Sequence, residues 1–109
     1  MSAEVSEVVG RASFVRITRE EPGLHQELWC CDGGPWEGYV LASAIFPPVP
    51  LPRGFTAWPQ IVEVMLFAAD ENGAHTGARE HAAFRGIREP IEAFRRSGYQ
   101  IEQIEQVSP

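Results

Sequence analysis

Short runs of apolar and β-branched residues, separated by turn residues, predict strands in the part of the chain before residue 70. Arg11 to Thr18 is the first such run. Glu20-Glu21-Pro22-Gly23 follows it as a turn, because Pro-Gly favours the backbone angles of a type II turn. His25 to Cys31 is the second run, and it ends at the loop Asp32-Gly33-Gly34-Pro35. The pattern therefore predicts two strands joined by a tight turn.

Two further segments carry apolar residues on both faces. Trp36 to Phe46 is apolar at both even and odd positions in its middle, which is typical of a central strand covered on both sides. Gln60 to Ala69 has one wholly apolar face, and only Glu63 interrupts the other among its apolar positions. Asp70-Glu71-Asn72-Gly73 closes this strand with turn residues. We expect the two strands to pair antiparallel as the spine of a sheet.

The segment between these two strands is rich in proline. Pro47 to Pro59 holds five of the nine prolines of the chain. Proline removes backbone donors from a strand ladder, so the segment is not expected inside the sheet. It is predicted to form a long hairpin loop or a lid.

Gly77 to Gly98 carries the only helical pattern. Spacings of three, four and three residues place four apolar side chains on one stripe: Phe84, Ile87, Ile91 and Phe94. Pro90 lies within this segment, and a proline inside a helix loses one backbone hydrogen bond and clashes with the preceding turn. A helix with a kink or a break near residues 86–90 is therefore predicted.

Tyr99 to Val107 alternates loosely and is expected to return as a short edge strand, with its glutamates and glutamines exposed. Strands dominate this order of elements, and the helix is segregated near the end, which indicates the α+β class. We predict an antiparallel sheet of four to five strands with one kinked C-terminal helix packed on one face. Residues 1–109 are expected to form a single domain, and the conformation of residues 1–10 is left open.

One helix cannot bury both faces of such a sheet. The apolar second face of the two middle strands must then be covered by the N-terminal segment or by a second copy of the protein. We therefore expect a homodimer.

The charge of the chain narrows the choice of partners. It has 15 acidic residues against 9 basic ones and a formal net charge of −6, which disfavours nucleic acid as a partner. No apolar run is long enough to span a bilayer, and Met1 to Val9 lacks the positive start of a secretory signal. The expectation is a cytoplasmic protein without a membrane partner.

The two cysteines are adjacent in the sequence. Neighbouring residues of a strand point to opposite faces, so Cys30 and Cys31 are not expected to form a disulfide with each other. One is expected to be a small buried apolar residue, with the other on the opposite face. A metal or redox role is the alternative, but the CxxC spacing that would favour it is missing.

Few residues suggest acid–base chemistry. Glu63 lies among apolar neighbours, where burial would raise its pKa, although exposure at an edge is the favoured interpretation. His75 and His81 flank Gly77 and could approach each other, with Asp70 nearby in the sequence. Their spacing matches no compact metal-ligand motif, so no metal and no cofactor is predicted. His25, the third histidine, is assigned to the surface or to a cap.

Aromatic residues gather around the small residues of the 36–46 strand and in the proline-rich segment. The set is Trp29, Trp36, Tyr39, Phe46, Phe55 and Trp58. Filling of the core is one explanation, and an apolar pocket rimmed by a loop is the other. The predicted ligand-binding residues are Trp36, Tyr39, Phe55, Trp58, Glu63 and His81.

Two functional hypotheses follow. The favoured one is a non-enzymatic domain that binds a small apolar molecule or a protein partner and self-associates. The alternative is a small enzyme with an acid–base pair drawn from Glu63, Asp70, His75 and His81 in the same aromatic pocket. The first is favoured because no nucleophile–base pair, cofactor loop or metal set is evident.

Overall fold

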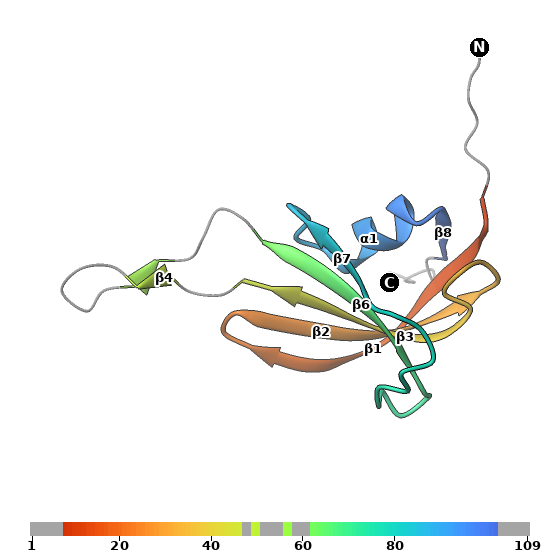
Figure 1. Ribbon diagram of the computed structural model, residues 1–109, viewed down its shortest axis with the longest axis horizontal. Coiled ribbons are helices and arrows are strands. Elements are labelled where there is room, and N and C mark those ends of the chain that lie inside the picture. The colour runs from red at the N-terminus through yellow and green to blue at the C-terminus, as the bar shows by residue number, and fades with distance from the viewer. Residues whose placement is uncertain (1–7, 47–48, 51–55, 58–61, 103–109) are drawn as a thin grey trace, which may run out of the picture.

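The computed structural model describes residues 8–46, 49–50, 56–57 and 62–102. In this part the chain is mostly sheet, with one short helix (Figure 1). The elements in chain order are β1 (Gly10–Glu21), β2 (Leu24–Asp32), β3 (Gly38–Ile45), β4 (Val49–Pro50), β5 (Thr56–Ala57), β6 (Glu63–Ala69), β7 (Ala82–Arg85), α1 (Pro90–Arg96) and β8 (Tyr99–Glu102).

Six of the strands form one sheet in the order β7-β6-β3-β2-β1-β8, which curls into a half-barrel. β8 runs parallel to β1, and every other pair in this sheet is antiparallel. The prediction of four to five antiparallel strands is therefore wrong in number and in direction. The chain leaves β7 at one edge and reaches β8 at the opposite edge through α1, and such a crossover allows parallel pairing.

The predicted spine and the first hairpin are confirmed. β3 pairs antiparallel with β6 from Tyr39 opposite Ala69 to Ile45 opposite Glu63. The turn is shorter than predicted, because Glu20 and Glu21 belong to β1 and only Pro22 and Gly23 join it to β2. Gly23 has a φ of 85°, which suits glycine at this turn position. β4 and β5 form a separate two-stranded hairpin in the proline-rich segment, outside the six-stranded sheet, as predicted.

The long helix predicted over 77–98 is wrong. Gly86 has a φ of 84°, which a helix does not accommodate, and its N–H donates to the Val62 carbonyl beside β6. Glu89 is extended, as residues before a proline usually are. Pro90 then starts α1 instead of kinking a longer helix, because a proline at the first helical position loses no intrahelical bond.

The main core lies on the face of the sheet that packs against α1, called here the helix face. Val40, Ala42 and Ala44 of β3 share it with residues of the neighbouring strands. α1 contributes Ala93 and Phe94, which have no exposed surface. The four apolar residues expected on one helical stripe all contact this core, although they come from a strand, a loop and a helix: Phe84, Ile87, Ile91 and Phe94.

The opposite face, called here the outer face, is covered in part by the chain itself. Cross-strand pairing puts Arg16, Leu28, Leu41 and Phe67 in one row on this face. The Arg16 guanidinium donates to the Asn72 carbonyl at one end of the row, and His75 stacks on Phe67 at the other. The loop between β6 and β7 therefore reaches both ends of this row, and Leu28 and Leu41 between them are buried.

This arrangement changes the reason for expecting a homodimer. The prediction depended on an apolar second face with no cover, but neither Leu28 nor Leu41 needs a second copy to be shielded from water. Self-association therefore remains a prediction, and the apolar residues that support it now lie along β1 instead.

The two cysteines lie on opposite faces of β2, as expected. Cys31 belongs to the core on the helix face, and Cys30 is partly exposed beside Tyr39 on the outer face. Burial, together with the charge of Cys30, raises the pKa of the Cys31 thiol to about 12. Cys31 therefore stays a neutral thiol at physiological pH and acts as a small apolar residue.

Tyr99 fastens β8 to the loop between β2 and β3. Its hydroxyl donates to the Gly33 carbonyl at 2.6 Å and accepts the Trp36 backbone N–H at 2.7 Å. Gly34 has a positive φ and lies against this hydroxyl so closely that an added Cβ would collide with it. Burial of the ring raises the pKa of Tyr99, against the opposing effect of the Trp36 N–H.

Replacing Tyr99 with phenylalanine is expected to lower the free energy of unfolding by about 1–2 kcal/mol, because the variant leaves the Gly33 carbonyl and the Trp36 N–H without their partner. Urea denaturation monitored by tryptophan fluorescence measures the change. The matched control is Tyr39→Phe on the outer face, expected to stay within about 0.5 kcal/mol. Equal losses in the two variants would contradict this role for Tyr99.

Candidate functional site

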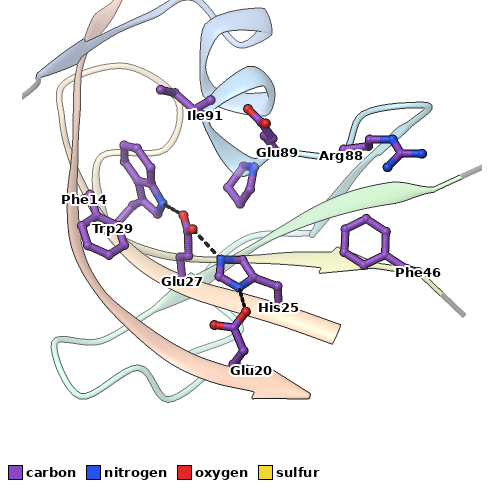
Figure 2. A pocket seen from close by; sticks show the side chains of 10 residues that line it. Phe14, Glu20, His25, Glu27, Trp29, Phe46, Arg88, Glu89 and Ile91 are labelled. Atoms are coloured by element: carbon purple, nitrogen blue, oxygen red, sulfur yellow. Dashed lines mark hydrogen bonds and ion pairs between the residues drawn. The ribbon is translucent and has the colours of Figure 1, made fainter. Parts of the chain in front are cut away.

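A cleft of about 550 Å³ opens on the helix face, between the β1–β2 hairpin and the segment that leads into α1 (Figure 2). Its volume lies within the usual range for small-molecule sites. The lining residues are Phe14, Glu20, His25, Glu27, Trp29, Phe46, Arg88, Glu89, Pro90 and Ile91. The cleft thus combines an apolar, aromatic wall with several ionisable groups.

β2 supplies the floor of the cleft through the alternation of a strand. His25, Glu27 and Trp29 are two residues apart, so all three side chains point to the helix face. His25 Nε2 bonds to Glu27 Oε2 at 2.6 Å, and Trp29 Nε1 donates to Glu27 Oε1 at 2.7 Å (Figure 2). The Glu27 side chain is only 16% exposed, and both of its oxygens are held by ring N–H groups.

β1 brings a second carboxylate to the same row. The tight turn places Glu20 opposite His25, and the Glu20 carboxylate lies 3.1 Å from His25 Nδ1. Two register shifts interrupt β1, between Phe14 and Arg16 and between Ile17 and Arg19. Each shift reverses the alternation of β1 once, so the two together restore it, and Phe14 and Glu20 both face the cleft.

The charge of His25 follows from its two partners. Carboxylates only accept hydrogen bonds, so an imidazole bonded to Glu20 and Glu27 carries a proton on each nitrogen. Burial alone lowers the pKa of His25, but the hydrogen bonds and charges of Glu27 and Glu20 together outweigh it, and the pKa is raised above 6.5. Below this raised pKa, the row Glu20–His25–Glu27 is therefore a cation held between two anions.

An NMR titration of the His25 ring is expected to show a midpoint above 6.5, and Glu27→Gln is expected to move it down. A histidine whose pKa is raised by folding stabilises the protein fully below its unfolded value, and this contribution is lost as the pH rises through the folded value. Denaturation at stepped pH should show that loss in the parent and not in His25→Gln. A midpoint at or below 6.5 would contradict the assigned row.

The opposite wall of the cleft is set by the chain before α1. Ile87 is buried in the core and fixes the segment in place. Arg88 and Glu89 follow with exposed side chains, and the Pro90 and Ile91 side chains complete the wall. The third side of the cleft is formed by Phe46, which directly follows β3.

The N–H of Phe46 donates to the Gly23 carbonyl at 2.8 Å. This bond ties Phe46 to the β1–β2 turn, next to the floor of the cleft. The aromatic ring is therefore positioned by the same turn that places Glu20 opposite His25.

The structure separates the predicted aromatic ligand-binding residues. Trp36 is buried in the core, with the Arg79 guanidinium 5.2 Å from the centre of its ring. Tyr39 lies on the outer face of β3, between Cys30 and Ala69. Phe55 and Trp58 lie outside the described residues. Trp29 and Phe46 are the members of the aromatic set that line the cleft: both belonged to the cluster identified from the sequence.

The predicted acid–base residues lie elsewhere. Glu63 begins β6, where it pairs with Ile45 and Arg85. His75 and His81 both pack against Phe67. Phe67 lies four residues after Glu63, about 13 Å along the same strand. The structure therefore brings the two histidines together on the outer face, at the other end of β6 from Glu63.

Asp70 caps its own turn. Its Oδ1 accepts the backbone N–H groups of Ala74 and Asn72, each at 2.9 Å. These bonds, with that of Ala74 the largest effect, lower the pKa of Asp70. The carboxylate is thus engaged in turn formation.

His25, Glu27 and Glu20 are the residues that sequence reasoning missed. Spacing by two within a predicted strand already placed His25, Glu27 and Trp29 on one face, and this signal was present in the sequence. A two-residue turn at Pro22-Gly23 also implies that Glu20 pairs with His25. The remaining wall, from Arg88 to Ile91, was not predicted, because these residues were expected to lie inside a helix.

The described residues contain neither a cluster of metal ligands nor a helix that could span a membrane. Across them, no three side chains from histidine, cysteine, aspartate and glutamate are grouped so that they could hold a metal ion. Glu20, His25 and Glu27 bond to one another and do not converge on a common point. Over the same residues, no helix has the length and hydrophobicity needed to cross a membrane.

Comparisons complete the description of the site. No protein-family model, curated protein or solved structure matches this chain.

Proposed function

We propose that the protein is a non-enzymatic binding module whose cleft on the helix face takes a small, largely apolar ligand. The observation that carries the proposal is the cleft itself, in which aromatic and aliphatic side chains surround a fixed row of polar groups. Small-molecule sites commonly have this composition, with apolar walls that supply affinity and few polar groups that fix orientation.

The side chains of the polar row are held in place by one another. Glu27 is held from two sides, and Trp29 beneath it packs on Phe94 of α1 at 4.8 Å between ring centres. Side chains held in this way lose little freedom when a ligand binds, which favours affinity. The cleft therefore has the preorganised floor that a binding site needs.

A screen of small amphipathic compounds by protein-observed NMR tests the proposal. A subset of compounds is expected to shift the Trp29 indole N–H signal in a saturable way. The Trp36 indole signal serves as an internal control, because Trp36 lies under Arg79 and does not line the cleft. A library that leaves the Trp29 signal unmoved would refute the proposal.

A matched pair of variants on β1 locates the binding. Phe14 and Val15 are neighbours with 43% and 42% exposure, but only Phe14 lines the cleft. Phe14→Ala is expected to weaken the affinity of any compound found, and Val15→Ala to leave it unchanged. If the two variants behave alike, the compounds bind somewhere other than this cleft.

Acid–base catalysis is a second candidate, and the row Glu20–His25–Glu27 is the observation that favours it. The carboxylates of the row keep free acceptor positions and can take a proton from a bound molecule as general bases, while His25 keeps them oriented. The earlier alternative of a Glu/His pair in an aromatic pocket is thus proposed with different residues. Catalysis predicts that a bound compound is converted over time in the NMR tube and that His25→Gln stops the conversion.

Self-association is the third part of the proposal. Several apolar side chains on or next to β1 are exposed, and they support it as contacts for a second copy or another protein: Val8, Val9, Phe14, Val15 and Ile17. Sedimentation velocity at micromolar concentration measures the mass directly. A dimer is expected to revert to a monomer in the variant Ile17→Lys, and a monomeric parent would refute this part.

A further inference from the structure

The polar side chains on the floor of the cleft use their donors on one another. His25 bonds through Nδ1 to Glu20 and through Nε2 to Glu27, and Trp29 gives its one ring N–H to Glu27. Neither ring has another N–H to offer to a ligand. The carboxylates keep acceptor capacity, because each offers about four lone-pair positions. A ligand that reaches this floor therefore meets acceptors.

The charges around the cleft also favour a ligand that is positively charged and donates hydrogen bonds. Glu20, Glu27 and Glu89 are carboxylates, whereas His25 and Arg88 are the only cations among the lining residues. Figure 2 shows Arg88 on the side of Phe46, away from Glu27. The floor beneath a bound ligand is thus net negative even with His25 protonated.

The walls of the cleft suit a compact apolar body. Phe14 and Phe46 flank it on two sides, and Ile91 lies on the side of α1 (Figure 2). Pro90 of α1 also lines it. Both phenylalanine rings are partly exposed. The face of an aromatic ring attracts a cation, so these walls favour positive charge as well as apolar surface.

We infer that the ligand is an organic cation, an ammonium or amidinium-type group on a compact aromatic or aliphatic body. This inference rests on the proposed binding function and names the chemical class for the same cleft. The charged group donates to Glu27 and approaches Glu89, and the apolar body lies between Phe14 and Phe46. An anionic or purely accepting ligand would find no donor on the floor and would meet repulsion from the carboxylates.

Three probes that differ only in their terminal group test the inference: phenethylamine, 2-phenylethanol and phenylacetate. Affinity is measured from the Trp29 indole N–H shift. The amine is expected to bind about tenfold or more tightly than the alcohol, because hydrogen bonds to charged groups contribute about 1.5–3 kcal/mol. Phenylacetate is expected to bind most weakly.

Charge-removing variants assign the effect to residues. Glu27→Gln keeps an acceptor for Trp29 and is expected to weaken amine binding about tenfold and alcohol binding by a smaller factor, because only the amine loses an ion pair. Glu89→Gln is a second test on an exposed residue, where folding is not at risk, and should weaken the amine in the same direction. Glu71→Gln makes the same change of net charge outside the cleft and should have no effect.

The outcomes separate the inference from the function beneath it. If the alcohol or phenylacetate binds as tightly as the amine, or if neither Glu27→Gln nor Glu89→Gln weakens the amine, the cation inference is wrong and the binding function stands. If other compounds of the wider screen bind but the amine does not, the inference is again wrong. If no compound of any charge moves the Trp29 signal, both fail.

Discussion

Replacing Phe94 with alanine is expected to lower the free energy of unfolding by about 3–5 kcal/mol, the usual cost of truncating a buried aromatic ring. Phe94 has no exposed surface. Its ring packs against Trp29 at 4.8 Å and against Tyr99 at 6.2 Å between ring centres. The truncation therefore removes contacts to both β2 and β8.

The dependence of α1 on Phe94 makes this loss large. α1 has seven residues, and a helix this short is not stable by itself in water. Its packing on the sheet through Ala93 and Phe94 is what keeps it folded. Loss of Phe94 therefore weakens the whole connection between β7 and β8.

Urea denaturation monitored by circular dichroism measures the change, with Phe14→Ala as the matched control. Phe14 also contacts Trp29, edge-on at 5.8 Å, but it is partly exposed, so the same truncation is expected to cost less than about 1.5 kcal/mol. Similar losses in the two variants would contradict the docking of α1 through Phe94.

Alternation along the strands was sufficient to predict most of the sheet. β3 and β6 were expected as an antiparallel spine because both carry apolar residues on two faces, and the structure pairs them in that way. The edge strand expected over 99–107 is present in its described part as β8, with Gln100 and Glu102 exposed, and residues 103–107 lie outside the described residues. Its direction was missed, because it depends on where the chain crosses the sheet, and strand sequences do not encode that.

The helix shows where a periodic pattern misleads. Phe84, Ile87, Ile91 and Phe94 have helical spacing, but the same side chains also reach one core from a strand, a loop and a short helix. The backbone conformations that Gly86 and the residue before Pro90 adopt exclude one continuous helix and leave the strand, loop and short helix. A positive φ at Gly86 and the extended residue before Pro90 are incompatible with a continuous helix.

The candidate site was only partly visible in the sequence. Alternation in the predicted strand places His25 and Glu27 on one face, but the sequence prediction named Glu63 and the two later histidines instead, which are flanked by apolar residues or by a turn. Phe14 could not be placed, because the two register shifts of β1, which the sequence does not reveal, set how this strand pairs with β2. Glu89 could not be assigned to the cleft from the sequence, because its position depends on where the helix of this segment begins.

Replacing Glu27 with leucine is expected to lower the free energy of unfolding by about 2–3 kcal/mol, although leucine has a similar volume and suits a largely buried site. The variant leaves the buried Trp29 Nε1–H without an acceptor and removes the closer of the two carboxylates bonded to His25. Glu27→Gln is expected to cost less than about 1 kcal/mol. Its amide oxygen still accepts from Trp29, and its amide nitrogen can donate to a neutral His25.

The comparison of the two variants separates hydrogen bonding from charge. Both are measured by urea denaturation at pH 6 and again at pH 8, with Glu71→Leu as an exposed control expected to stay within about 0.5 kcal/mol. The difference in the free energy of unfolding between the parent and Glu27→Gln should be smaller at the higher pH. His25 of the parent, whose pKa is raised by its carboxylate partners, begins to lose its proton as the pH rises. A leucine variant as stable as the parent would mean that apolar packing replaces the polar row without loss. The row would then serve binding and not stability, and the same variant should still fail to bind phenethylamine.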